Sequence, residues 1–509
     1  MVDQPMSEVQ LGYLRHFDNV SRRQPNDWTF MNGRAPGQLD FGSYRFQLSY
    51  MAYAAALAHV HRAPAAPGAF KETIARLIRR LMEPEVWMYW RDASRAGGIG
   101  NPHLAGSEEQ WDPVGRDNIM YSAYLQSLTL LFDVLFDDHR FADPEALSFE
   151  FNTMFWGDGG EHGGLHRRFA YDQYSLNETL YWKMVENGYL GIACEPNCVF
   201  QICNQPAILG FRMHDMLTGD SRGEEVVRGY RQAWDDFGGP VAPNGHLYMF
   251  AMQDSRTPIP NFEGLAWGDT WYCALANTWN SDFVRDFWGQ VRDEHVLRGP
   301  DGTMSCQIPG PQEYDNDTCD FGWLAICASE MGDEEILDGL SRHAERFMRP
   351  MSFDGGRLFA REDRLTDEEG NYTRMEALTG NSLLAYASLN VPDGMRALYQ
   401  QPWPAGHFEE PNLSDVSDVV AVAAARYDGP RGELTMTLQR QPERSGAPQV
   451  GLANVWGRGP WTLSKDGAEL ATGDEHDVSS SQGPVVRRDD RLWLDDASPG
   501  AYALRWQRP

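Results

Sequence analysis

The strongest constraint on the fold is a long helical pattern that is apolar almost all the way round. Segment 120–136 carries a single charged residue, Asp133, and its apolar side chains fall on every face of a helix. Such a helix has to be packed on both sides. Other segments, such as 334–343, are amphipathic and fit the outside of a helical layer. The sequence therefore predicts inner helices covered by outer ones.

Helical periodicity fills most of the chain between about residues 10 and 425. The segments are 45–61, 70–82, 118–136, 179–189, 199–217, 223–237, 267–277, 282–294, 321–331, 334–348 and 377–389. This pattern predicts a mainly α fold, an α/α toroid of helical hairpins, over residues 1–427. In such a fold the pocket lies at the loop end of the inner helices.

The pattern changes after residue 428. Alternation with a period of two runs through 433–440, 461–465, 485–488, 491–495 and 500–506, with Gly, Asp and Pro turns between them. We therefore predict a small C-terminal antiparallel β domain over 428–509. Its expected role is packing or an oligomer contact rather than catalysis.

The charge balance narrows the class of partner. The chain has 509 residues and a net charge of −29, and Lys and Arg do not cluster over an aromatic face. This excludes nucleic acid and anionic membranes as expected partners. The chain has no run of 18 apolar residues, so the sequence predicts no membrane span. The first residues lack the basic and apolar segments of a secretory signal, which predicts a cytoplasmic protein.

Two of the seven cysteines, Cys194 and Cys203, stand nine residues apart. An odd number of cysteines predicts free thiols. On one straight helix, nine residues correspond to about 900° of rotation, so the two thiols would point to opposite faces. Pro196 suits the first position of a helix, which would leave Cys194 in the loop before it and Cys203 about two turns inside. We expect these thiols to stand on two sides of a small ligand.

The segment around these thiols resembles the linalool dehydratase/isomerase family. The matching residues are Cys-Glu-Pro at 194–196 and Cys-Asn at 203–204. Asn-Ile-Met-Tyr at 118–121 resembles the family's active-site helix, with Val-Trp-Met-Tyr-Trp at 86–90 before it. Glu-Met-Gly-Asp at 330–333 is a third match. The resemblance covers residues from about 10 to 400 and leaves out the C-terminal β region.

The resemblance implies an (α/α)6 barrel and a homo-oligomer, a pentamer in the known enzyme. It implies a lyase or isomerase whose substrate is an apolar, terpenoid-like allylic alcohol or alkene, held in a pocket without a cofactor. Cys194 and Cys203 match the family's catalytic thiols, and Met120 matches a pocket methionine. Asp18 matches an aspartate that reaches the pocket from a neighbouring subunit.

The chain departs from the family pattern at two positions. Tyr124 stands where the family has a histidine, and Gln24 stands where it has a tyrosine. A further pocket tyrosine of the family falls near Tyr44 to Tyr53; the matching position stays open, and Tyr53 is one candidate. These departures put linalool itself in doubt as the substrate.

Dehydration of an alcohol needs an acid for the leaving hydroxyl, a base for the C–H proton and a pocket that keeps water from the cation. A thiol, with an ordinary pKa of about 8.5, can give or take a proton. We expect the helix start to favour Cys194 as the thiolate and leave Cys203 as the neutral thiol, so that the pair divides the two roles. Tyr124 would donate to the substrate hydroxyl. Asp18, expected in a short polar loop between apolar residues, would relay a proton.

Further pocket residues are expected around this pair. Tyr121 is three residues from Tyr124 and shares its helix face. Glu195 would cap the helix or orient Cys194. Aromatic-rich segments, typical of an apolar pocket or of a sugar platform, add four candidate binding residues: His246, Tyr248, Trp267 and Trp271.

Two other functions stay open. Many α/α toroids process carbohydrates with paired carboxylates, which Glu263, Asp269 and Asp320 could supply. The other is a non-catalytic protein that binds a hydrophobic ligand. We expect no cofactor and no metal, since His162 and His166 flank a Gly-rich loop without a third ligand.

Overall fold

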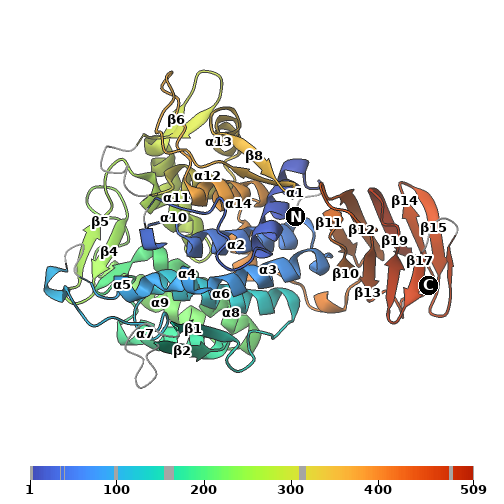
Figure 1. The fold of residues 1–509 in the computed structure, drawn as a ribbon, viewed down its shortest axis with the longest axis horizontal. Helices are drawn as coiled ribbons and strands as arrows, with labels where there is room; N and C mark the ends of the chain where they lie inside the picture. The colour runs from blue at the N-terminus through green and yellow to red at the C-terminus, as the bar shows by residue number, and fades with distance from the viewer. Residues whose placement is uncertain are drawn as a thin grey trace.

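The computed structural model describes residues 4–34, 36–38, 40–96, 101–153, 165–308, 317–480 and 485–507. Helices dominate the chain up to about residue 400, and strands dominate the rest. The helices form one body, and the β-rich region lies at one end of it (Figure 1). The predicted mainly helical fold with a C-terminal β region is confirmed.

Helices buried on nearly every side alternate with helices buried on one side. The buried helices are α2 (Tyr44–Arg62), α6 (Ile119–Phe136), α8 (Gln201–Thr218), α10 (Ala266–Ala276), α12 (Asp320–Met331) and α14 (Leu384–Leu389), which follows the π-helical turn η5 (Thr379–Leu383). Each contacts the next in this order, and α14 contacts α2, so that their contacts close a ring.

The helices outside this ring carry one apolar face. They are α1 (Glu8–Ser21), α3 (Pro67–Leu81), α7 (Gln173–Glu186), α9 (Arg222–Asp235), α11 (Ser281–His295) and α13 (Glu334–Phe347). In α13 the side chain of Asp333 accepts from the N–H of Ile336 and starts the helix. Ile336, Leu340 and Ala344 then follow at intervals of four and are buried.

Helix α6 is the most apolar element of the ring. It is the one helix of the described chain long and apolar enough to cross a membrane by length and composition, and it is wholly buried. It contacts α2, α3, α7 and α8. A core helix passes the same test, so this is weak evidence for a membrane span.

The C-terminal strands form two antiparallel sheets. One has the order β10-β13-β18-β17 and the other the order β11-β12-β19-β14-β15-β16. The strands are β10 (Asn412–Val416), β11 (Val420–Asp428), β12 (Glu433–Arg440), β13 (Val450–Ala453), β14 (Trp461–Lys465), β15 (Ala468–Gly473), β16 (Val478–Ser480), β17 (Val485–Arg488), β18 (Arg491–Leu494) and β19 (Gly500–Trp506). The first two begin ahead of residue 428, where we placed the domain boundary.

Short hairpins decorate the helical body. They pair β1 (Leu147–Asn152) with β2 (His166–Tyr171), β6 (Val296–Arg298) with β7 (Met304–Cys306), and β8 (Pro350–Phe353) with β9 (Gly356–Phe359). A three-stranded sheet consists of β3 (Cys198–Phe200), β4 (Tyr248–Met252) and β5 (Thr257–Pro260). Its first strand, β3, lies directly before α8 in the chain, next to the site. The remaining helical segments are short: η1 (Pro36–Gln38), α4 (Pro84–Trp87), α5 (Tyr89–Ala93), η2 (Pro102–Leu104), α15 (Gly394–Gln400) and η6 (His407–Glu409).

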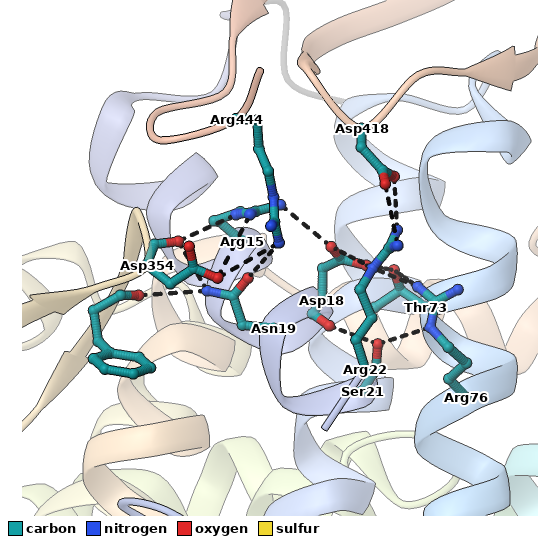
Figure 2. A network of polar contacts seen from close by, with 11 residues as sticks. Arg15, Asp18, Asn19, Ser21, Arg22, Thr73, Arg76, Asp354, Asp418 and Arg444 are labelled. Carbon is teal, nitrogen blue, oxygen red and sulfur yellow. Dashed lines mark hydrogen bonds and ion pairs between the residues drawn. The ribbon is translucent and has the colours of Figure 1, made fainter. Parts of the chain in front are cut away.

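Asp18 lies at the junction between the helical body and the β region (Figure 2). Its carboxylate accepts from Arg22 at 2.8 Å, from Arg76 at 2.7 Å and from Thr73 at 3.1 Å. Arg22 also binds Asp418, in the loop between β10 and β11, at 2.7 Å. The network therefore ties α1 to α3 and to the β region, beside a cavity of about 280 Å³.

The prediction that Asp18 lies in a polar loop was wrong, because this residue belongs to α1. Ser7 and Gln10 form a capping box that starts the helix. Phe17 and Val20 on either side of Asp18 are fully buried, so the local pattern is that of an amphipathic helix.

Candidate active site

Cys194 lies in a tight turn rather than at the mouth of a helix. The N–H of Cys198 donates to Glu195 O at 2.9 Å, and the N–H of Cys194 donates to Cys198 O at 2.8 Å. Asn197, in this turn, has a φ of 71°. The prediction that Pro196 begins a helix was wrong, since the chain closes this turn and then forms strand β3.

Helix α8 begins at Gln201, so Cys203 lies in its first turn. All seven cysteines are free, as predicted. Cys194 and Cys203 are 1% and 3% exposed. Burial raises the pKa of Cys194 well above its usual value, and the contact with the Cys203 thiol raises it further. The positive end of the α8 dipole acts on Cys203 instead, opposite to the predicted arrangement.

Asn204 fixes the loop that carries Cys194. Its amide oxygen accepts from the N–H of Ile192 at 2.8 Å. Its amide nitrogen donates to Ile192 O at 3.0 Å and to Phe200 O at 2.8 Å. Gly191 packs against this amide with a φ of 127°, where a Cβ would come within 2.8 Å of the Asn204 nitrogen. The Cys-Asn pair of the sequence motif thus supplies one thiol, Cys203, and the side chain that holds the loop of the other thiol. We call the hydrogen bonds of Asn204 to this loop the clamp.

The start of α6 meets the same loop. The N–H of Asn118 donates to Cys194 O at 3.0 Å, and the N–H of Ile119 donates to Ala193 O at 3.2 Å. The Tyr89 hydroxyl donates to the side chain of Asn118. The structure therefore brings together three segments that the sequence resemblance selected separately.

Arg45, in α2, is a buried charge that the sequence analysis missed. It is 2% exposed, and its guanidinium lies 3.6 Å from Met120 Sδ and 4.0 Å from the centre of the Tyr89 ring. Burial raises the pKa of Glu195, and the charge of Arg45 opposes this shift. No motif marks an isolated arginine in a helix that otherwise reads as core, so only the structure identifies it.

An aromatic wall completes this part of the helical body. Tyr124 lies 5.6 Å from Phe46 and 5.9 Å from Tyr50, measured between ring centres. Trp271 donates to the Tyr50 hydroxyl at 2.9 Å. Burial raises the pKa of Tyr124 well above its usual value, with smaller contributions from Tyr50 and Cys203. Tyr124 is therefore a protonated hydroxyl near a site thiol.

The other predicted pocket residues divide into two groups. The Tyr53 hydroxyl lies 2.5 Å from the Ser127 hydroxyl, and the centre of its ring is 6.2 Å from that of Tyr124. The Trp267 ring is 4.6 Å from the Phe41 ring, between centres, and Phe41 also contacts Trp271. Tyr121 instead donates to Leu81 O at 2.8 Å. Tyr248, in β4, contacts Trp234 of the outer helix α9. Tyr53 and Trp267 thus join the wall, whereas Tyr121 and Tyr248 make contacts outside it.

The carboxylates considered for a glycosidase have other partners. Asp269 binds His246 at 2.9 Å, and Asp320 accepts from the N–H of Trp267 at 2.9 Å. Burial opposes ionisation of Asp269, but hydrogen bonds, that of His246 first, hold its pKa below the usual value. The same contact raises the pKa of His246. Glu263 is exposed.

His246, Asp269 and His295 form a buried group whose ligand atoms lie within 4.8 Å of one another. Sequence reasoning named His246 and Asp269 separately and missed His295. Of the histidines considered for a metal, His166 binds Glu150 at 2.9 Å, and His162 lies outside the described residues.

A family model described as linalool dehydratase/isomerase matches residues 45–365. The chain belongs to this family, since the match covers more than half of it. Arg45, both thiols and the clamp Asn204 all fall within the matched residues, whereas Asp18 and the β region fall outside.

Three solved structures show a distant likeness to this chain. An α-amylase from Clostridium perfringens is 10% identical with a TM-score of 0.40, covering 76% of this chain and 100% of that one. An inactive variant of an α-1,6-mannanase from Salegentibacter sp. is 10% identical with a TM-score of 0.39, covering 76% and 99%. An unsaturated glucuronyl hydrolase from Bacillus sp. GL1 is 11% identical with a TM-score of 0.38, covering 74% and 94%. Likeness at this level supports no conclusion about function.

Proposed function

We propose that this protein is a cofactor-independent dehydratase or isomerase that acts on an apolar, terpenoid-like or allylic alcohol. The observation that carries the proposal is the buried pair of interacting thiols, Cys194 and Cys203, beside the start of α6. Family membership supports the same reaction class.

In the proposed reaction, Cys194 is the acid and Cys203 the base. Burial keeps Cys194 as a neutral thiol that can donate its proton to the substrate hydroxyl. The C–O bond then breaks, water leaves and an allylic cation remains. The sulfur of Cys203, in the first turn of α8, has to start this step deprotonated, and it takes a proton from the adjacent C–H group to form the alkene. A proton passing back between the two thiols restores the starting state.

The surroundings suit this chemistry. The aromatic wall keeps water from the cation, and the aromatic faces stabilise positive charge. The Tyr124 hydroxyl donates a hydrogen bond to the substrate oxygen. Re-addition of water at the other end of the allylic system would give isomerisation by the same groups. Asp18 is left out of this assignment, because side chains of its own chain bind its carboxylate.

We further propose that the closed ring of buried helices is an (α/α)6 barrel, that the protein forms a homo-oligomer and that it works in the cytoplasm. The order of contacts from α2 round to α14 supports the first proposal. The other two rest on the family resemblance and on the sequence alone, and size measurements and cell fractionation would test them.

The test is turnover of a panel of allylic alcohols by full-length protein. Cys194→Ala and Cys203→Ala should each abolish alkene formation. Cys198→Ala is the matched control, because this thiol lies between them in the chain and bonds Asn101 instead. Full activity in both site variants would overturn the mechanism. Activity on a glycoside that is lost in Asp320→Asn, with the cysteines dispensable, would support a carbohydrate-active enzyme.

A further inference from the structure

Three side chains from separate segments meet behind the aromatic wall. His246 precedes β4, Asp269 lies in the first turn of α10, and His295 is the last residue of α11. They are 3%, 1% and 0% exposed. His246 Nδ1 lies 2.9 Å from Asp269 Oδ2, and His295 Nε2 lies 3.6 Å from the same oxygen.

His295 is the unusual member of the group. Its contact with Asp269 is too long for a hydrogen bond. Within the described chain, neither of its ring nitrogens has a hydrogen-bond partner. A fully buried imidazole without a hydrogen-bond partner is costly, and the contact of His295 Nε2 with Asp269 at 3.6 Å leaves room for a bound ion between them.

The spacing suits a metal ion. Two ligands at about 2.0–2.1 Å from a tetrahedral zinc ion are about 3.3 Å apart. The observed separations of 2.9 Å and 3.6 Å from Asp269 Oδ2 lie on either side of this value. Two imidazoles and one carboxylate are also a donor set that zinc and its neighbours in the first transition row prefer.

Neighbouring groups already orient the ligands. The N–H of Leu247 donates to Asp269 Oδ1 at 3.0 Å, which leaves Oδ2 to face the two imidazoles. His246 Nε2 lies 3.3 Å from Glu294 Oε1, so Nε2–H can point to this carboxylate while Nδ1 faces the group. A ligating histidine held by a carboxylate is the usual arrangement in metal sites.

We propose that His246, Asp269 and His295 bind one divalent transition-metal ion, with Zn²⁺ the best suited, and that Glu294 orients His246. The ion would join β4, α10 and α11. Asp269 lies on α10 between Trp267 and Trp271, which contact Phe41 on the other side of the helix. The site therefore supports the wall from behind, and its existence does not depend on the proposed reaction.

Metal binding to the full-length protein tests this directly. After treatment with EDTA, Co²⁺ should bind with one equivalent and give absorption bands typical of nitrogen and oxygen ligands, without the charge-transfer band of a thiolate. Zn²⁺ should displace it. A thiolate band in the wild type, or no stoichiometric binding, would overturn the proposal, and neither result depends on a variant that folds.

Variants locate the ion. Asp269→Asn should abolish stoichiometric binding, and Glu294→Gln should weaken it about 10–100-fold. His343→Gln is a matched control for a buried histidine, since His343 bonds Tyr372 O at 2.8 Å. Cys203→Ser should bind as the wild type does. Equal binding by folded Asp269→Asn, or loss in Cys203→Ser, would place the ion elsewhere and contradict the proposal.

Discussion

The clamp made by Asn204 gives a prediction whose size follows from the structure. Asn204 is fully buried and makes three hydrogen bonds to the backbone of Ile192 and Phe200, at 2.8, 3.0 and 2.8 Å. Asn204→Ala removes all three and leaves the Ile192 N–H without a partner. Each lost hydrogen bond costs about 1 kcal/mol, and the Ile192 N–H left without a partner costs more. The free energy for opening the loop that carries Cys194 should therefore fall by about 3–5 kcal/mol.

Thiol labelling followed by mass spectrometry measures this loss locally. A buried thiol reacts through local opening, so its labelling rate follows the opening free energy. A loss of 3 kcal/mol corresponds to a rise of about 10²-fold in the rate at Cys194. Cys327, fully buried in α12, serves as the reference thiol and should keep its rate.

Asn277→Ala is the matched control. Asn277 is also buried, but it bonds Asp393 beyond the C-terminal end of α10, away from the turn that carries Cys194. It should leave the ratio of the two labelling rates unchanged. A folded Asn204→Ala variant with the wild-type rate at Cys194, or with equal rises at Cys194 and Cys327, would refute the clamp.

Three further predictions concern the core, the wall and the junction. Burial raises the pKa of Glu330 from 4.5 to about 7, so between these pH values the folded state keeps a proton that the unfolded state has lost. The free energy of unfolding should therefore fall by up to about 3 kcal/mol as the pH rises from 4.5 to 7. Glu330→Gln should flatten this dependence in calorimetry, and an unchanged slope would contradict the prediction. Tyr124→Phe should lower kcat about 10–100-fold with little change in KM, while Tyr121→Phe, whose hydroxyl bonds Leu81 O, should keep wild-type kinetics. Asp18→Asn should lower the melting temperature and leave turnover unchanged; loss of turnover with an intact fold would instead favour the family's role for this residue in a neighbouring subunit.

Much of the architecture could be predicted from the sequence because periodicity reports burial directly. The all-round apolar pattern of 120–136 became the buried helix α6, and the alternation in 433–440 became β12 with Leu434, Met436 and Leu438 buried. The two wrong predictions of local structure, at Asp18 and at Pro196, have local causes. The capping box at Ser7 makes Asp18 helical, and the turn at Asn197 delays α8 to Gln201.

The site was only partly predictable, because its members depend on contacts between distant segments. The motif around Cys194 and Cys203 named the thiols and their clamp. It gave no information on Arg45, whose guanidinium contacts Met120 and the Tyr89 ring on other segments. His295 likewise becomes a candidate metal ligand only through its contact with His246 and Asp269, which lie on other elements.

Hydrogen exchange from solvent would show whether the two thiols carry the proton transfers. An allylic alcohol is incubated with the enzyme in D₂O, and deuterium in the recovered alcohol and alkene is measured by mass spectrometry. We expect incorporation at the carbon next to the cation with the wild type and with Cys198→Ala, and none above background with Cys203→Ala. Equal incorporation with and without Cys203 would contradict it.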